Sequence, residues 1–127
     1  MLIVANHPLG SLDGLALLKL VSEIRTDVKI VATTLLNCID PLKGLFLSVD
    51  NLAKSAHHRD SMNQIVQALE SEQAVILFPT GEVSRISPLG VRDGKWKTGF
   101  LSLAKKTKAP IVPVYIGGKN SSLFYGL

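Results

Sequence analysis

Cysteine is nearly absent from this sequence of 127 residues, in which Cys38 stands alone. A single cysteine excludes an internal disulfide framework and a cysteine-rich zinc site, and we expect Cys38 to be a small buried apolar residue. Charged residues make up only 19% of the chain and apolar residues 46%, a balance that excludes an intrinsically disordered protein. No apolar run approaches the ~20 residues of a membrane-spanning helix. The length is that of one globular domain, and we expect residues 1–127 to form a single domain.

Acidic residues are scarce in the last third of the chain. Residues 85–127 hold eight Lys/Arg and one acid, Asp93, whereas residues 1–84 hold six Lys/Arg and nine Asp/Glu, so the two parts carry +7 and −3. A basic segment favours an anionic partner, such as phosphate, an acidic carrier protein, an anionic membrane surface or nucleic acid. Nucleic acid is the least favoured because the sequence contains no recognition-helix motif. For the three lysines within residues 105–108, a solvated helix face is the simpler explanation.

Short apolar segments alternate with amphipathic ones along the chain. The apolar segments are rich in valine, isoleucine and leucine and mostly continuous, as expected of strands buried on both faces of a parallel sheet. They are Leu2–Ala5, Val28–Ala32, Leu45–Val49, Ala74–Phe78 and Ile111–Ile116. Between them, apolar residues recur at helical spacing within Leu17–Ile24, Met62–Leu69 and Phe100–Ala104. This alternation predicts an α/β domain with a mostly parallel central sheet flanked by helices. Because the first strand begins with the first residues, we expect the chain to be a fragment of a longer protein.

Two segments rich in glycine, proline and polar residues each follow a predicted strand. One is Asn6–Gly14, and the other is the longer Pro79–Gly94. Ligands of parallel α/β sheets bind beyond the carboxyl ends of the strands, and long loops inside compact domains are usually functional. We therefore expect these two loops to contain the functional residues.

His7 and Asp13 lie in the first of these loops, separated by the five residues Pro8–Leu12. Pro8 and Gly10 favour a turn, which can bring the carboxylate back to the imidazole. Such a pair can act as a general base, because the carboxylate fixes the tautomer of the ring while the other ring nitrogen takes a proton. A turn histidine followed by an N-capping aspartate explains the same residues without any chemistry. The pair alone leaves both interpretations open.

The sequence contains no recognisable nucleophile for covalent catalysis. The G-x-S-x-G pattern of a nucleophile elbow is absent. A phosphate-binding P-loop is absent as well, because Gly90–Lys95 has one residue too few between its glycines and Trp96 follows where Ser or Thr is needed. If His7 is a general base, the nucleophile belongs to the substrate.

Four segments in a fixed order resemble the motif blocks of one protein family. Asn6–Gly14 resembles the histidine–aspartate block of the glycerolipid acyltransferases, the lysophosphatidic acid acyltransferase superfamily. Phe78–Arg85 is similar to that family's Phe-Pro-Glu-Gly-Thr-Arg-Ser block, Trp96–Phe100 to its Phe-Lys-Lys-Gly-Ala-Phe block, and Ala109–Val114 to its Val-Pro-Ile-Val-Pro-Val block. The ordered set spans nearly the whole chain and favours the catalytic interpretation of the histidine–aspartate pair.

The resemblance implies an acyltransferase that moves a fatty acyl group from an acyl-coenzyme A or acyl-carrier-protein thioester to a hydroxyl of a lysolipid. In that reaction His7 would deprotonate the hydroxyl, Asp13 would orient His7, and the alkoxide would attack the thioester without an acyl-enzyme. The resemblance implies no metal and no cofactor beyond the acyl donor. It also implies a cytoplasmic protein attached peripherally to the inner membrane face. A lipid- or acyl-carrier-binding module of the same fold, without turnover, is the alternative.

The chain departs from the family pattern in ways that bear on the acceptor. The spacing between histidine and aspartate is one residue longer than the family's commonest. Asn51 and Val83 stand about where the family has arginines that are taken to hold a phosphate, which neither residue can bind in the bidentate manner of arginine. The pattern is more similar to a bacterial branch that carries a hemolysin label and includes O-acyltransferases of lyso-ornithine lipids. We therefore expect an acceptor with an amino-acid head group, whose ammonium could pair with Glu82.

The same blocks contain the remaining candidate substrate-binding residues. Besides Glu82, these are Asn6, Gly81, Ser84, Arg85, Lys95 and Lys97. The two lysines flank Trp96, and we expect them to meet the negative charge of a phosphate or of the thioester donor. For Trp96 itself, a place in the core and a place in a substrate groove are equally expected.

Overall fold

The computed structural model describes residues 1–32, 40–49 and 56–126. Two residues with sequence-based expectations, Cys38 and Asn51, lie outside these ranges.

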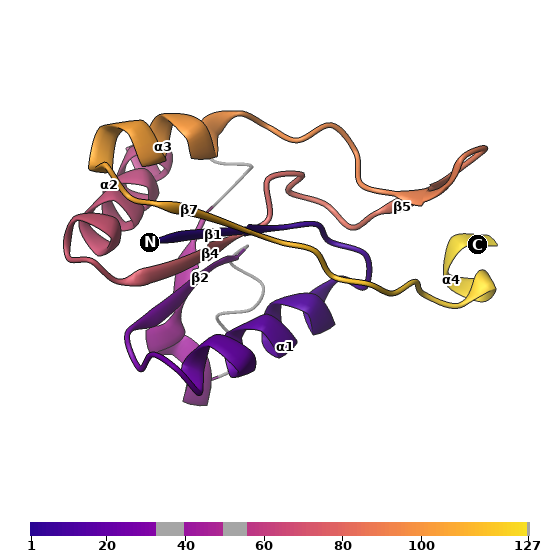
Figure 1. Ribbon diagram of the computed structural model, residues 1–127, viewed down its shortest axis with the longest axis horizontal. Helices are drawn as coiled ribbons and strands as arrows, with labels where there is room; N and C mark the ends of the chain where they lie inside the picture. The colour runs from indigo at the N-terminus through magenta and orange to yellow at the C-terminus, as the bar shows by residue number, and fades with distance from the viewer. Residues whose placement is uncertain (33–39, 50–55, 127) are drawn as a thin grey trace.

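A five-stranded parallel sheet forms the centre of the fold (Figure 1). In sheet order it contains β3 (Phe46–Ser48), β2 (Val28–Ala32), β4 (Ala74–Leu77), β1 (Leu2–Ala5) and β7 (Ile111–Val114), and every neighbouring pair is parallel. All five predicted strands are confirmed, and none differs from its predicted ends by more than two residues. The α/β class with a parallel sheet is therefore confirmed.

Helices cover both faces of this sheet. α1 (Ser11–Ser22) lies against one face, and α2 (Ala56–Glu70) and α3 (Gly99–Thr107) lie against the other (Figure 1). A 3₁₀ helix, η2 (Asp40–Leu45), precedes β3, and the short α4 (Ser122–Gly126) follows β7. Among the residues that the structure describes, no helix is both long and apolar enough to cross a bilayer.

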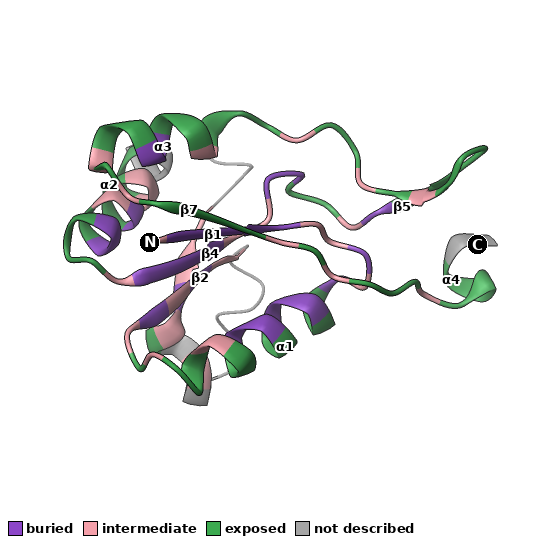
Figure 2. Cartoon of the chain, viewed as in Figure 1, coloured by how far each residue is buried: buried purple, intermediate pink, exposed green. Residues whose placement is uncertain are grey.

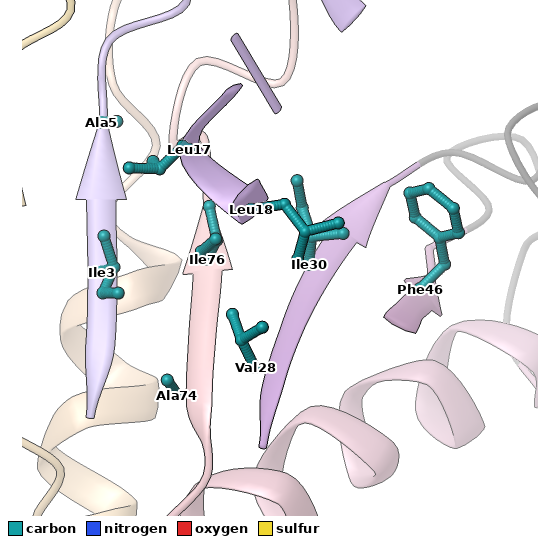
Figure 3. Close-up of a cluster of buried hydrophobic side chains, with 9 residues drawn as sticks. All are labelled: Ile3, Ala5, Leu17, Leu18, Val28, Ile30, Phe46, Ala74 and Ile76. Carbon is teal, nitrogen blue, oxygen red and sulfur yellow. The ribbon is translucent and has the colours of Figure 1, made fainter. Parts of the chain in front are cut away.

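The side chains of β1 alternate between two cores, one on each face of the sheet. Ile3 and Ala5 pack toward α1, whereas Leu2 and Val4 pack toward α2 and α3. Figure 3 shows the core on the α1 side, where side chains from four strands and from α1 meet. Burying each leucine, isoleucine or valine side chain contributes roughly 1.5–3 kcal/mol. The central strands are therefore firmly held, and they provide a rigid base for the loops at their carboxyl ends.

The edge strand β7 differs from the sequence-based expectation. Its continuous apolar run predicts a strand buried on both faces, but Ile111 and Val112 are 37% and 38% exposed. Figure 2 shows β7 mostly green beside the purple β1. The reason is its position, because β7 pairs only with β1 and ends the sheet. Pro113, which has no N–H to donate, is tolerated at such an edge.

The long segment between β4 and α3 contains a hairpin that the sequence does not predict. β5 (Arg85–Ser87) and β6 (Gly90–Arg92) pair in antiparallel register and form a separate two-stranded sheet. The hairpin projects beyond the carboxyl ends of the central strands (Figure 1). Part of the predicted loop is therefore regular structure.

The sheet order brings the two motif loops together. β1 lies between β4 and β7, with Val4 opposite Leu77 and Ala5 opposite Val114. Because all three strands run parallel, their following segments leave the sheet at the same edge. The loop after β1 therefore meets the segment after β4, and the backbone N–H of Ser84 donates to the carbonyl of His7 at 2.7 Å.

Candidate active site

The structure brings His7 and Asp13 into contact. His7 Nδ1 lies 3.1 Å from Asp13 Oδ2, and the side chains of His7 and Asp13 are 17% and 0% exposed. The ring N–H is not aligned with this oxygen, and within the described part of the chain neither His7 Nδ1 nor Asp13 Oδ1 has a hydrogen-bond partner. The contact is therefore electrostatic at hydrogen-bond distance, of the kind that tightens when substrate binds. The imidazole also stacks on Phe78, with ring centroids 4.2 Å apart.

A tight turn before α1 accommodates the five residues between the pair. Asp13 Oδ2 accepts the backbone N–H groups of Leu9 at 2.7 Å and Gly10 at 3.1 Å. Gly10 adopts a φ of +83°, a region that favours glycine, and a Cβ there would lie 3.3 Å from a methyl carbon of Val83. The N-cap alternative for Asp13 is wrong, because Gly10 caps the helix and Asp13 occupies its third position. The carboxylate satisfies the turn and faces the imidazole at the same time.

The environment of His7 keeps its ring neutral. Burial lowers the pKa of the imidazole below its ordinary value, and the nearby carboxylates of Asp13 and Asp93 only partly oppose this effect. A neutral ring at neutral pH is the form that can accept a proton. The imidazole of His7 binds a proton more readily in the unfolded chain than in the folded one. The free energy of unfolding therefore keeps its full contribution from a neutral His7 above the ordinary pKa of ~6.5, and it loses that contribution as the pH falls through the lower folded-state pKa.

Asp93 is a component of the site that the sequence analysis did not identify. Its Oδ1 accepts the backbone N–H of His7 at 3.0 Å and also the hydroxyl of Ser84. Its Oδ2 accepts the indole N–H of Trp96 at 2.9 Å. One available signal was its position as the lone acid in the basic last third of the chain.

A cavity of about 450 Å³ opens beside His7. It extends over the carboxyl ends of β2 and β4, and its lining is mainly apolar, with Leu18, Ile30 and Phe100 as examples. Glu82 and Lys97 add charged groups to this lining. An apolar cavity of this size with a few polar groups is typical of small-molecule sites, and we refer to it below as the groove.

The structure divides the predicted substrate-binding residues into two groups. Gly81, Glu82 and Lys97 line the groove with His7. Four others, which are Asn6, Ser84, Arg85 and Lys95, are not part of its lining.

Asn6 and Arg85 are engaged in contacts of their own. The side-chain amide of Asn6 donates to the carbonyl of Ile116 at 2.8 Å and accepts its N–H at 2.6 Å, which ties the end of β1 to the segment after β7. Arg85 pairs with Glu82 at 2.8 Å on the exposed surface. A role of these residues in substrate binding stays a prediction.

Trp96 does not line the groove. Its ring meets Phe100 edge-on, with centroids 6.1 Å apart, and packs against the core formed with α2 and α3. Of the two expected places, the structure favours the core. Within residues 1–32, 40–49 and 56–126, no cluster of three His, Cys, Asp or Glu side chains is arranged to hold a metal ion.

The chain is similar to known proteins over nearly its whole length. The family model for acyltransferases matches residues 1–127, which is the whole chain. The chain belongs to the acyltransferase family. It is 34% identical over 125 residues to a lyso-glycine lipid O-acyltransferase of Bacteroides thetaiotaomicron and 30% identical over 125 residues to one of Phocaeicola vulgatus, and each match covers 98% of this chain. These matches cover 45% and 44% of the two relatives, so the chain spans less than half of their length. No solved structure matches the chain significantly.

Membership of the acyltransferase family confirms the resemblance seen in the motif blocks. Each block has a defined place in the fold: Asn6–Gly14 follows β1, Phe78–Arg85 follows β4, Trp96–Phe100 leads into α3, and Ala109–Val114 contains β7. One of the departures from the family pattern also lies at the site. Val83, which replaces an arginine of the family pattern, lines the groove.

Proposed function

We propose that this chain is the catalytic region of a lipid O-acyltransferase that uses His7 as its general base. The observation that carries the proposal is the His7–Asp13 pair, 3.1 Å apart, at the edge of an apolar groove of about 450 Å³. A fatty acyl chain is apolar and needs such a groove, and a hydroxyl acceptor needs a neutral base beside it. The names of the two relatives support the same reaction class.

In the proposed reaction the acceptor hydroxyl loses its proton to Nε2 of His7 while Nδ1 faces Asp13. The acceptor oxygen then attacks the carbonyl carbon of a thioester, an ester C–O bond forms, and the C–S bond breaks. The proton on His7 passes to the leaving thiolate, so that the ring is neutral again. Asp13 stabilises the transient imidazolium by its negative charge. The donor thioester belongs to coenzyme A or to an acyl-carrier protein. Both present the acyl group on the same phosphopantetheine arm, so the same step applies to either donor.

For the acceptor, we propose a lysolipid with an amino-acid head group. The two relatives are named for a lyso-glycine lipid, and glycine presents a carboxylate whether or not its nitrogen is acylated. Lys97 lines the groove, and no carboxylate of the described residues pairs with it. Glu82 is already paired with Arg85 at 2.8 Å, which disfavours the predicted pairing of Glu82 with an ammonium. A carboxylate bound by Lys97 therefore fits the charges of the groove better than an ammonium bound by Glu82.

The first test is an acceptor panel assayed with the full-length protein and both thioester donors. We expect transfer to lyso-glycine lipid and lyso-ornithine lipid in preference to lysophosphatidic acid. In Lys97→Met the acceptor KM should rise about tenfold or more, because a hydrogen bond to a charged group contributes about 1.5–3 kcal/mol. Lys106→Met, which removes an exposed charge from the last turn of α3, is the matched control. Transfer mainly to lysophosphatidic acid, or an unchanged acceptor KM in Lys97→Met, would contradict the acceptor proposal.

A lipid acceptor also requires contact with a membrane surface, which we propose for the β5–β6 hairpin. Ile86 and Leu89 are 63% and 74% exposed on this hairpin, and the exposed Arg85 and Arg92 lie at its base. Apolar side chains beside basic ones are typical of proteins that bind an anionic bilayer at its interface.

The membrane contact predicts salt-dependent binding to vesicles. Each basic residue near an anionic surface contributes about 1 kcal/mol, so Arg92→Gln should weaken binding roughly fivefold in low salt. Arg59→Gln on α2 is a control of equal charge change. Sedimentation of the full-length protein with vesicles of phosphatidylglycerol and phosphatidylcholine measures the effect. At 0.5 M salt the Debye length is about 4 Å, and binding that persists unchanged there would contradict an electrostatic attachment.

A further inference from the structure

Asp93 makes three hydrogen bonds to three separate parts of the site. It accepts the backbone N–H of His7 from the loop after β1, the hydroxyl of Ser84 from the segment after β4, and the indole N–H of Trp96 from the segment before α3. All three donors are neutral, and none of the ion pairs among the described residues includes this carboxylate. The lone acid of the basic last third is therefore fixed beside the proposed base.

The bonds of Asp93 also close the β5–β6 hairpin at its base. Ser84 directly precedes β5 and Asp93 directly follows β6, so their mutual bond joins the two ends of the hairpin. The N–H of Ser84 donates in turn to the carbonyl of His7 at 2.7 Å. Both backbone polar groups of His7 are therefore held by this closure, its N–H by Asp93 and its carbonyl by Ser84.

We propose that Asp93 is a positioning residue that fixes the backbone of His7, so that the imidazole stays between Asp13 and the groove. The inference rests on the proposed function of His7 and goes beyond it. The side chain of His7 has two rotatable bonds, and Asp13 and Phe78 contact its ring. The direction in which the side chain leaves the backbone depends instead on the peptide groups that Asp93 and Ser84 hold. A displacement of 1 Å at a reacting group can reduce the rate by about 10²-fold.

Only a carboxylate can satisfy all three donors. Both oxygens of aspartate accept hydrogen bonds, whereas asparagine offers one acceptor oxygen and one NH₂ donor. In Asp93→Asn the NH₂ group would face either the indole N–H of Trp96 or the two donors at Oδ1. The substitution keeps the shape of the side chain and breaks the arrangement of its bonds, and it is therefore the sharpest variant.

The test compares Asp93→Asn in the full-length protein with Asp27→Asn, which removes a carboxylate paired with Arg25 after α1. We expect kcat to fall about 10- to 100-fold in Asp93→Asn, with the KM for the donor changed less than about threefold. The indole N–H signal of Trp96 in a ¹⁵N NMR spectrum should shift, and its assignment follows from its loss in Trp96→Phe. Trp96→Phe keeps the acid and removes one donor, so its kcat should fall less.

The pH profile separates positioning from general damage to the fold. The charged groups around His7 are Asp13 and Asp93, with Glu82 and Lys97 in the same groove. Removing the negative charge of Asp93 should move the acid limb of kcat/KM in Asp93→Asn to lower pH, which a merely destabilised protein would not show. An unchanged kcat, or an unshifted Trp96 indole signal, would overturn the proposal. Full activity of His7→Ala would instead refute the proposed function, and the indole signal would still report whether Asp93 holds this segment.

Discussion

Replacing His7 with alanine is expected to reduce acyl transfer by about 10²- to 10⁴-fold, the usual contribution of a general base. The reason lies in the geometry, because the proposed base His7 lines the groove and has a carboxylate 3.1 Å from its Nδ1. Without the imidazole, the acceptor hydroxyl must lose its proton to water. Because the backbone N–H and carbonyl of His7 are still held by Asp93 and Ser84 in the variant, we expect the fold to persist.

The measurement is kcat/KM of the full-length variant with the preferred acceptor, alongside far-UV circular dichroism and vesicle binding. Retained structure and lipid binding with lost transfer would support the catalytic role. Retained transfer would refute it. Absence of transfer in the unmodified protein, with lipid or carrier binding intact, would support the alternative of a binding module that has lost turnover.

If His7 is the base, as proposed, the neutral state of its ring predicts the pH dependence of the reaction. Burial lowers the pKa of this imidazole below its ordinary value of ~6.5. The base is therefore active at neutral pH, and kcat/KM should decline only as the pH falls below ~6.5. A profile whose acid limb lies well above pH 7 would show that a different group, or a protonated His7, controls the rate.

The elements of the sheet were predictable because their signal is local. Each central strand is a continuous run of apolar residues, and both faces of a buried parallel strand give such a run. β7 carries the same pattern, but its exposure depends on the strand order, which no local pattern contains. The β5–β6 hairpin was missed because its local sequence signal is weak. Its strands have three residues each and lie among glycine, proline and charged residues that also favour an open loop.

The site was predictable only in part. The motif blocks predicted that His7 and Asp13 act as a pair. The structure places these side chains together despite the longer spacing, because Gly10 adopts a positive φ and Asp13 holds the turn. Asp93 was not predicted, because its bonds reach the backbone of a residue 86 positions away. A contact of that kind arises from the adjacency of β1 and β4 in the sheet.

Asparagine at position 13 is expected to reduce kcat by about 10²-fold or more while changing stability little. The amide oxygen of Asp13→Asn can still accept the N–H groups of Leu9 and Gly10, which Asp13 Oδ2 accepts at 2.7 and 3.1 Å. The negative charge that stabilises the imidazolium of His7 is lost, however, and the basicity of the ring falls with it. A substitution that keeps the turn and removes the charge therefore tests the electrostatic role of Asp13 alone.

Alanine at the same position separates the two roles of Asp13. Asp13→Ala leaves the N–H groups of Leu9 and Gly10 without their acceptor, and an unsatisfied buried donor costs about 1–3 kcal/mol. The free energy of unfolding, measured by urea denaturation, should therefore fall in Asp13→Ala but not in Asp13→Asn, with Asp27→Asn as the control for the loss of an acid. Activity should be low in both Asp13 variants. An asparagine variant with the kcat of the unmodified protein would mean that Asp13 serves the turn alone, and that His7 reaches its catalytic state without a carboxylate partner.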